Sequence, residues 1–128
     1  MNKNIIFYPA VFTPEEIGFS VVVPDIEGCF SEGDSLSEAC LYVKDAIGLC
    51  LEDMEEFPAP SNPQSIELKE NEFLVLIEFD MVKYKQRTSK RAVKKTLSIP
   101  AWLNEEAERR HVNFSGVLSA ALKNHLNL

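Results

Sequence analysis

The sequence predicts an α+β protein with two modules: a β-β-β-α-β sheet with one covering helix, then a shorter strand–helix–helix tail. Three observations support this fold class. Apolar residues form short β-rich segments before residue 34 and recur at helical spacing after it. The composition changes at residue 83, where a basic segment poor in apolar residues begins. The charge changes sign at the same point.

The net charge of −7 is the average of two oppositely charged parts. Residues 1–82 contain three basic residues against 17 acidic ones, a net charge of −14. Residues 83–128 contain ten basic residues against three acidic ones, a net charge of +7. Such asymmetry suggests modules with different partners. We therefore expect an acidic domain at 1–82, a basic linker at 83–91 and a C-terminal domain at 92–128.

Three strands are predicted at the start of the acidic domain. Residues 5–12 are β-rich but contain Pro9, which predicts an edge strand or a strand with a break. Residues 18–23 and 29–33 are predicted to form the second and third strands. Gly28 can supply a positive φ in the tight turn between them.

A long amphipathic helix and a returning strand complete the acidic domain. Ser35 and Glu38 form a capping box, and apolar residues at i+3/i+4 spacing follow for about 20 residues. A proline-rich stretch at 57–63 ends the helix, and 65–68 is compatible with a short strand. The long apolar run at 73–81 predicts a strand with a central place in the sheet.

The tail is predicted to depend on a second copy of the chain. Residues 96–100 alternate polar and apolar, which predicts a strand, and amphipathic helices are expected at 102–110 and 114–126. Chains shorter than about 40 residues usually need a metal, disulfides or oligomerisation to be stable. Because the tail contains no set of metal ligands or disulfides, we expect two tails to pair their strands antiparallel and interlock their helices.

The tail resembles the ribbon-helix-helix (βαα) family. The matching features are the basic pair Lys94-Lys95, an alternating strand that ends in Pro100, and Asn113-Phe114-Ser115-Gly116 at the start of a helix rich in Leu and Ala. The resemblance implies a dimerisation and DNA-binding module whose two-stranded ribbon enters the major groove.

Strand pleat and helix polarity select the candidate DNA contacts. Leu97 and Ile99 would point into the dimer core, and their polar neighbours would point outward to base edges. The N-terminus of the last helix offers backbone N–H groups for a phosphate. The base-contact candidates are Lys94, Thr96 and Ser98, and the phosphate-contact candidates are Asn113, Ser115 and Gly116. The basic residues at 83–91 would add salt-dependent attraction to the DNA backbone. Two alternatives stay open: residues 83–91 are only a solvated linker, or the tail serves oligomerisation alone.

The acidic domain resembles the N-terminal domain of the HicB antitoxin family. The main motif is P-D-x-x-G-C-x-x-x-G-D-x-x-x-E-A at 24–39, preceded by Y-P-A-V-F at 8–12 and G-F-S-V at 18–21. The resemblance implies a partial, degenerate ribonuclease-H-like sheet without nuclease activity. It also implies a partner toxin of the HicA type, a small basic ribonuclease that cleaves mRNA. The antitoxin would occlude the toxin's active site and repress its own operon.

A net charge of −14 suits such a basic partner, because it would steer rapid association. The candidate toxin contacts, chosen by their position at a strand edge or in acidic turns, are Tyr8, Asp25, Glu27 and Asp34.

Enzymatic function is not expected. A ribonuclease-H-type nuclease needs clustered carboxylates to hold metal ions, and residues 5–12 contain none. Asp25, Glu27 and Asp34 could form an acidic cluster, but carboxylates in turns more often bond to their own backbone. No metal or cofactor is expected. Two rival functions remain: a stand-alone ribbon-helix-helix transcription regulator whose first domain senses a small ligand, and an active nuclease.

The cysteines and the N-terminus suggest a cytoplasmic location. Cys29, Cys40 and Cys50 cannot all pair, and none lies in a C-x-x-C motif. The chain also lacks a recognisable secretion signal and an apolar run of the roughly 18 residues that a membrane helix needs.

Overall fold

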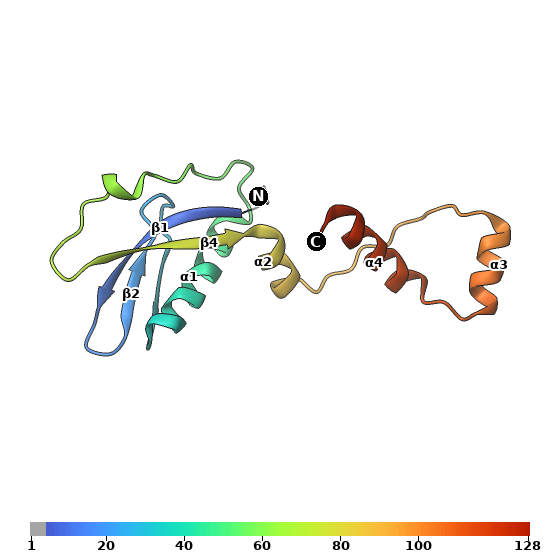
Figure 1. Cartoon of the computed structure of the whole chain (residues 1–128), viewed down its shortest axis with the longest axis horizontal. Helices are drawn as coiled ribbons and strands as arrows, with labels where there is room; N and C mark the ends of the chain where they lie inside the picture. Colours follow the sequence, from blue (N-terminus) through green and yellow to red (C-terminus); the bar gives the residue numbers. More distant parts are fainter. Residues whose placement is uncertain (1–4) are drawn as a thin grey trace. The chain divides into compact units, whose positions relative to one another are not determined.

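The computed structural model describes residues 5–128 and separates the chain into two units, one that ends at Arg91 and one at Ala92–Leu128. The first unit contains a four-stranded antiparallel sheet in the order β3-β2-β1-β4 (Figure 1). Its strands are β1 (Ile5–Pro14), β2 (Phe19–Val22), β3 (Phe30–Gly33) and β4 (Phe73–Asp80). The predicted strand–strand–strand–helix–strand order and the α+β class are therefore confirmed. Gly28 has the positive φ expected in the turn before β3.

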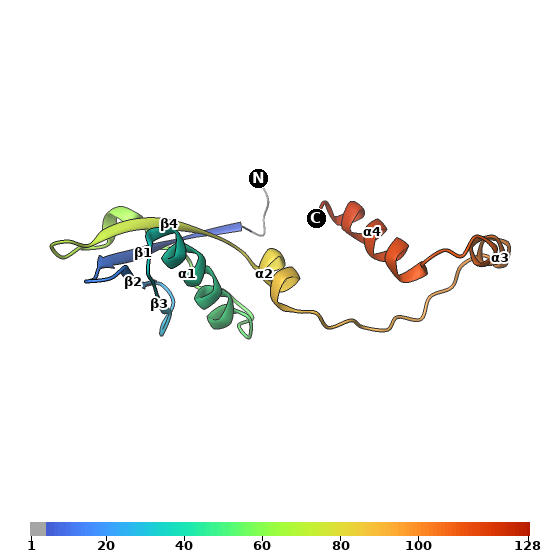
Figure 2. The same cartoon turned by 90° about the horizontal axis from the view of Figure 1, so that it is seen from below.

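Helix α1 (Leu36–Leu51) covers one face of this sheet (Figure 2). Its start follows the predicted cap, because the Glu38 backbone N–H donates to the Ser35 hydroxyl at 3.1 Å. The buried stripe of α1 packs on the inward side chains of β1, β2 and β4 to form one core. The largest fully buried side chains of this core are Tyr8, Phe12, Ile26, Ile47 and Leu51.

The position of β4 differs from the expectation. β4 is an edge strand that pairs only with β1, whereas its apolar run predicted a central place. The central strand is β1, although it contains Pro9. At Pro9 the strand pairs with Leu76 of β4, but its ladder with β2 begins only at Val11. Pro9 therefore has a sheet neighbour on one side only, which is where a proline without an N–H is tolerated.

The segment between α1 and β4 contains a single turn of 3-10 helix, η1 (Pro63–Ser65), and no strand at 65–68. The Asn62 side chain caps this turn by accepting from the Gln64 N–H at 2.9 Å. A proline at the first helical position favours such a turn, since its missing N–H would have no partner there anyway.

Residues 83–88, expected to be linker, instead belong to helix α2 (Met81–Thr88). The Asp80 carboxylate caps α2 by accepting from the backbone N–H groups of Val82 and Lys83. Tyr84 is buried and its ring lies over Gly48 of α1, where a β-carbon would overlap it. Arg87 also forms an ion pair with Asp45 of α1. The helix is therefore held to the sheet unit by the Tyr84 ring, the partly buried Met81 side chain and one exposed ion pair.

This correction changes the division of charge. The basic residues at 83–91 belong to the first unit, which leaves five basic residues against three acidic ones in 92–128. The net charge of the second unit is therefore +2, whereas residues 83–128 together have a net charge of +7.

The second unit consists of α3 (Ala101–Arg109) and α4 (Phe114–Leu126), close to the expected helices. Residues 92–100 form no strand, which corrects the prediction for 96–100 in the single chain. A β-strand needs a hydrogen-bonding neighbour, and none of the described residues pairs with this segment. Within residues 5–128, none of the helices has the length and apolar character needed to cross a membrane.

The contact between Tyr84 and Gly48 gives a first prediction. Gly48→Ala should destabilise the protein by about 1–3 kcal/mol, because the added methyl displaces the Tyr84 ring from a tight contact. In a Tyr84→Ala background the same change should instead stabilise by up to about 1 kcal/mol, since alanine is the better helix former. Urea denaturation of the four proteins would measure both effects. Equal effects of Gly48→Ala in the two backgrounds would show that α2 does not dock through this contact.

Candidate functional site

The candidate base-contact residues lie in the segment that precedes α3. Lys94, Thr96 and Ser98 are all exposed, as a surface role requires. Their apolar neighbours Leu97 and Ile99 are 55% and 47% exposed, so the single chain does not bury them as a ribbon core would. The alternation of inward and outward side chains at 96–99 thus stays a prediction about the paired state.

The candidate phosphate-contact residues form the N-terminal cap of α4. The Asn113 side-chain oxygen accepts the Gly116 backbone N–H at 3.1 Å. A β-carbon at Gly116 would lie 2.9 Å from the Asn113 Nδ2 atom, so glycine lets the cap close tightly. The Gly116 N–H is therefore already hydrogen-bonded within the cap, while Ser115 beside it is exposed. These three residues do come together as expected, and their phosphate role stays a prediction.

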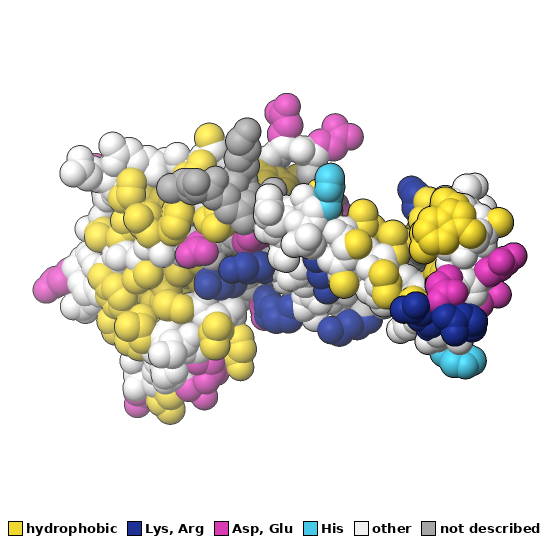
Figure 3. All heavy atoms as spheres, turned by 45° about the vertical axis from the view of Figure 1, so that its right-hand side comes forward, with side chains coloured by type: hydrophobic (Ala, Val, Ile, Leu, Met, Phe, Trp, Pro, Cys, Tyr) yellow, Lys and Arg dark blue, Asp and Glu magenta, His cyan; other side chains and the backbone are white. Residues whose placement is uncertain are grey.

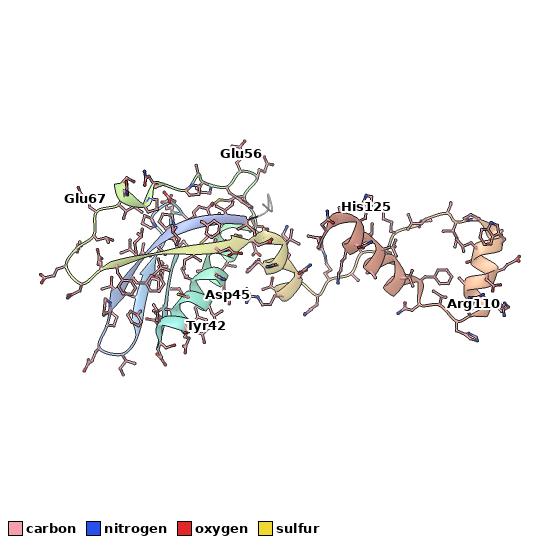
Figure 4. All side chains as sticks on the ribbon, viewed as in Figure 1. Tyr42, Asp45, Glu56, Glu67, Arg110 and His125 are labelled. Carbon is pink, nitrogen blue, oxygen red and sulfur yellow. The ribbon has the colours of Figure 1, made fainter. Side chains whose placement is uncertain are left out.

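Both tail helices expose the side chains that should form a core. None of residues 92–128 is buried. Apolar residues recur along one face of α4, and Trp102 on α3 is 69% exposed. Figure 3 shows hydrophobic side chains gathered over these helices. The exposed apolar residues of α4 are Phe114, Val117, Leu118, Leu122 and Leu126. His125 of α4 and Arg110, which follows α3, are also exposed (Figure 4).

Tyr8, a candidate toxin contact, has no exposed surface and cannot reach a partner. Its side chain points into the core under α1, and its hydroxyl donates to the Pro58 carbonyl oxygen at 2.7 Å. Burial, together with the nearby charge of Asp25, raises the pKa of Tyr8 above its usual value. The residue was chosen as a strand-edge position, but β1 is the central strand.

Asp25 is half-buried and holds the segment after α1 in place. One carboxylate oxygen accepts the Ser61 backbone N–H at 2.9 Å, and the other accepts the Ser61 hydroxyl. Glu27 and Asp34 are exposed and remain available to a partner. Asp34 lines a shallow hollow together with Glu15, Glu32 and Glu38. The four candidates therefore divide into two structural residues and two accessible ones.

Sequence reasoning predicts that the face of the sheet opposite α1 stays open to water or to a partner, but it did not identify the residues of this outer face. The register places Leu74, Val11, Val22 and Phe30 side by side in one row across all four strands. Leu76 and Pro9 form the next row. We call these six residues the outer apolar face. In Figure 3 hydrophobic side chains also gather over the unit that contains the sheet. The apolar run of β4 was the available signal, since it supplies side chains to both faces.

No catalytic arrangement is evident among residues 5–128. They include no group of three or more His, Cys, Asp and Glu side chains placed to hold a metal ion. Burial, followed by the nearby Cys50 thiol, raises the pKa of Cys29 to about 12. Cys29 is therefore a protonated thiol at neutral pH, and a thiol in that state is a poor nucleophile.

One family model matches most of the chain. Residues 8–122 match the family described as the HicB-like antitoxin of bacterial toxin–antitoxin systems. An uncharacterised 14.9 kDa protein of Haemophilus phage HP1 is 32% identical over 93% of this chain and 96% of its own length. Antitoxin HicB 2 of Photorhabdus laumondii is 37% identical, over 48% of this chain and 46% of its own length.

Solved structures give the same picture. A chain of a toxin–antitoxin complex from Streptococcus pneumoniae is 25% identical, with a TM-score of 0.58 over 94% of this chain and 99% of its own. The structure of antitoxin HicB3 is 24% identical, with a TM-score of 0.51 over 87% of this chain and 86% of its own. The second likeness supports the fold alone.

The Asp25 contacts give a second prediction. Asp25→Ala should lower the free energy of unfolding by about 1–3 kcal/mol, because it removes the acceptor for the Ser61 N–H and hydroxyl. Glu27→Ala, at an exposed acid two residues away, should change stability by less than about 0.5 kcal/mol. Urea denaturation measures both values. An Asp25→Ala protein as stable as wild type would show that Asp25 does not act as a structural anchor.

Proposed function

The chain belongs to the HicB-like antitoxin family, and from this premise we propose that it neutralises a HicA-type toxin and represses its own operon. The observation that carries the proposal is the family match, which spans both units at residues 8–122. The sheet unit would occlude the active site of a small basic mRNA-cleaving toxin. The paired tails would bind operator DNA. Inhibition would need no chemistry by this chain.

Exposed apolar surface supports the pairing of two tails. Every residue from Ala92 to Leu128 is at least partly exposed, and an apolar helical face of this size is rarely left in water. A second copy would cover the face of α4 and give residues 96–100 the strand neighbour that they lack. This is the ribbon-helix-helix arrangement that we propose for the second unit.

The charge of the tail bears on how DNA would be held. Each second unit has a net charge of only +2, so its attraction to DNA phosphates would depend strongly on Lys94 and Lys95, which lie beside the proposed ribbon. Lys90 and Arg91 precede the second unit and would add to this attraction. The rival function, a regulator that senses a small ligand, has less support, because the hollows found on the described residues are open depressions.

Co-purification with the product of the neighbouring reading frame, followed by mass measurement of the complex, tests the antitoxin role. A stable complex that suppresses cleavage of RNA by the partner is the expected result. A chain that binds no such product and still regulates transcription would favour the sensor.

The proposed ribbon gives a third prediction. Replacing Lys94, Thr96 and Ser98 together by Ala should abolish specific operator binding, at roughly 1–3 kcal/mol for each lost base contact, and leave toxin inhibition intact. A matched triple variant, Lys83, Lys85 and Lys90 to Ala, should lower affinity for all DNA and flatten its salt dependence without changing sequence preference. Electrophoretic mobility shifts on operator and scrambled DNA distinguish the two. Loss of toxin inhibition in the first variant would show that the two units do not act separately.

The uncovered tail gives a fourth prediction. A protein that ends at Arg91 should be monomeric, because the apolar surface of α3 and α4 is gone. It should still bind the toxin, because it keeps the sheet unit. Sedimentation equilibrium of the full chain and the truncated one measures the change. A truncated protein that remains dimeric would reveal an interface within the sheet unit.

A further inference from the structure

Five of the six residues of the outer apolar face are at least partly exposed in the described chain, and only Pro9 is fully buried. Along it, Val22 and Leu76 are each 51% exposed, and Phe30 is 71% exposed. Phe7, two residues before Pro9 on the same face of β1, is 43% exposed. In Figure 2, α1 lies against the opposite face of the sheet. Apolar side chains gathered in adjacent rows mark an interaction site more strongly than single exposed residues do.

A row of polar residues borders the apolar row. Thr13 and Ser20 face each other in the register, and Glu32 lies opposite Ser20. Glu72 extends this row, because the Thr13 hydroxyl donates to its carboxylate at 3.4 Å. Glu15 joins it by accepting from the Ser20 hydroxyl at 2.8 Å. The charged side chains of this border, which we call the acidic rim, are thus Glu15, Glu32 and Glu72.

The far side of the face is less acidic. Glu78 follows Leu76 on the outer side of β4 and lines a hollow that also contains Lys44 and Lys83. The loop before Glu72 contains one basic residue, Lys69, and two further acidic ones, Glu67 and Glu70. Negative potential is therefore concentrated along the edge marked by the acidic rim.

We propose that the outer apolar face and its acidic rim are the surface on which the toxin docks. This inference rests on the proposed antitoxin function and adds the location of the contact. An apolar centre with a charged border is the usual anatomy of a protein interface. A border of carboxylates complements a basic protein and would steer its approach.

The same charges oppose a second copy of the chain as the occupant. Two sheet units that met rim to rim through this face would bring like charges together at the border, which costs several kcal/mol in an interface. The exposed apolar residues of α1 form no comparable surface. Leu41 and Leu49 are 62% and 66% exposed, but Lys44 and Asp45 separate them along the helix. Asp45 on that helix, labelled in Figure 4, is already paired with Arg87 of α2.

The test compares two double variants of the full-length chain that change the net charge equally. Val22→Lys with Leu76→Lys places two cations on the outer apolar face. Leu41→Lys with Leu49→Lys places two on exposed positions of α1. Binding of each to the small basic product of the neighbouring reading frame is measured by calorimetry, and circular dichroism melts check folding.

We expect the first double variant to bind about 100-fold more weakly or worse, as when central interface residues are lost, and the α1 variant to bind as wild type does. Phe30→Gln, which adds no charge at the most exposed position of the face, should weaken binding in the same direction. Glu32→Gln with Glu72→Gln should slow association and reduce its dependence on salt.

Three outcomes would overturn the docking surface while leaving the antitoxin function in place. Unchanged binding by folded Phe30→Gln and Val22→Lys/Leu76→Lys proteins would exclude this face as the docking surface. Loss of binding only in the α1 variant would place the toxin on the helix side. A lower oligomeric mass for the Val22→Lys/Leu76→Lys protein than for wild type, measured without toxin, would show that another copy of the chain covers the face. If the wild-type chain does not bind the basic product at all, the proposed antitoxin function fails, and the docking surface with it.

Discussion

Apolar surface that one chain cannot cover by itself constrains everything else in this structure. The sheet unit has a single long helix, so only one face of the sheet is covered. The tail has two helices and no sheet, so neither helix finds a partner within residues 92–128 that buries it. Both units therefore leave apolar surface uncovered within the described chain.

Local signals predicted most of the elements because those elements are stabilised locally. The caps at Ser35 and Asn113 each begin the helix that the sequence indicated. Helix α2 escaped prediction because a single aromatic, Tyr84, holds it against a glycine distant in sequence. No apolar periodicity marks such a helix. The edge position of β4 was missed for a related reason, since an apolar run predicts cover on both faces whether or not the chain provides it.

The functional residues were harder to predict than the fold. Whether Tyr8 or Asp25 faces a partner depends on strand order and on contacts with Pro58 and Ser61 across the fold. An open sheet face could be expected from the single covering helix, but the residues of the outer apolar face could not be identified without the register, because they come from four strands. The segment at 94–98 is a separate case. It has no helix or strand in the single chain, so its proposed strand would form only when a second copy pairs with it.

The segment between α2 and α3 has a consequence of its own. Residues 89–100 contain no helix or strand, and all of them are exposed. If two tails pair as proposed, residues 96–100 join the ribbon and 89–95 remain as the tether, which reaches at most ~25 Å when extended. Each dimer then carries two sheet units on two such tethers. A partner or surface that presents two binding sites would then be held by avidity, at an effective concentration set by tether length. Shortening this segment would change how firmly a two-site partner is held while leaving each binding surface intact.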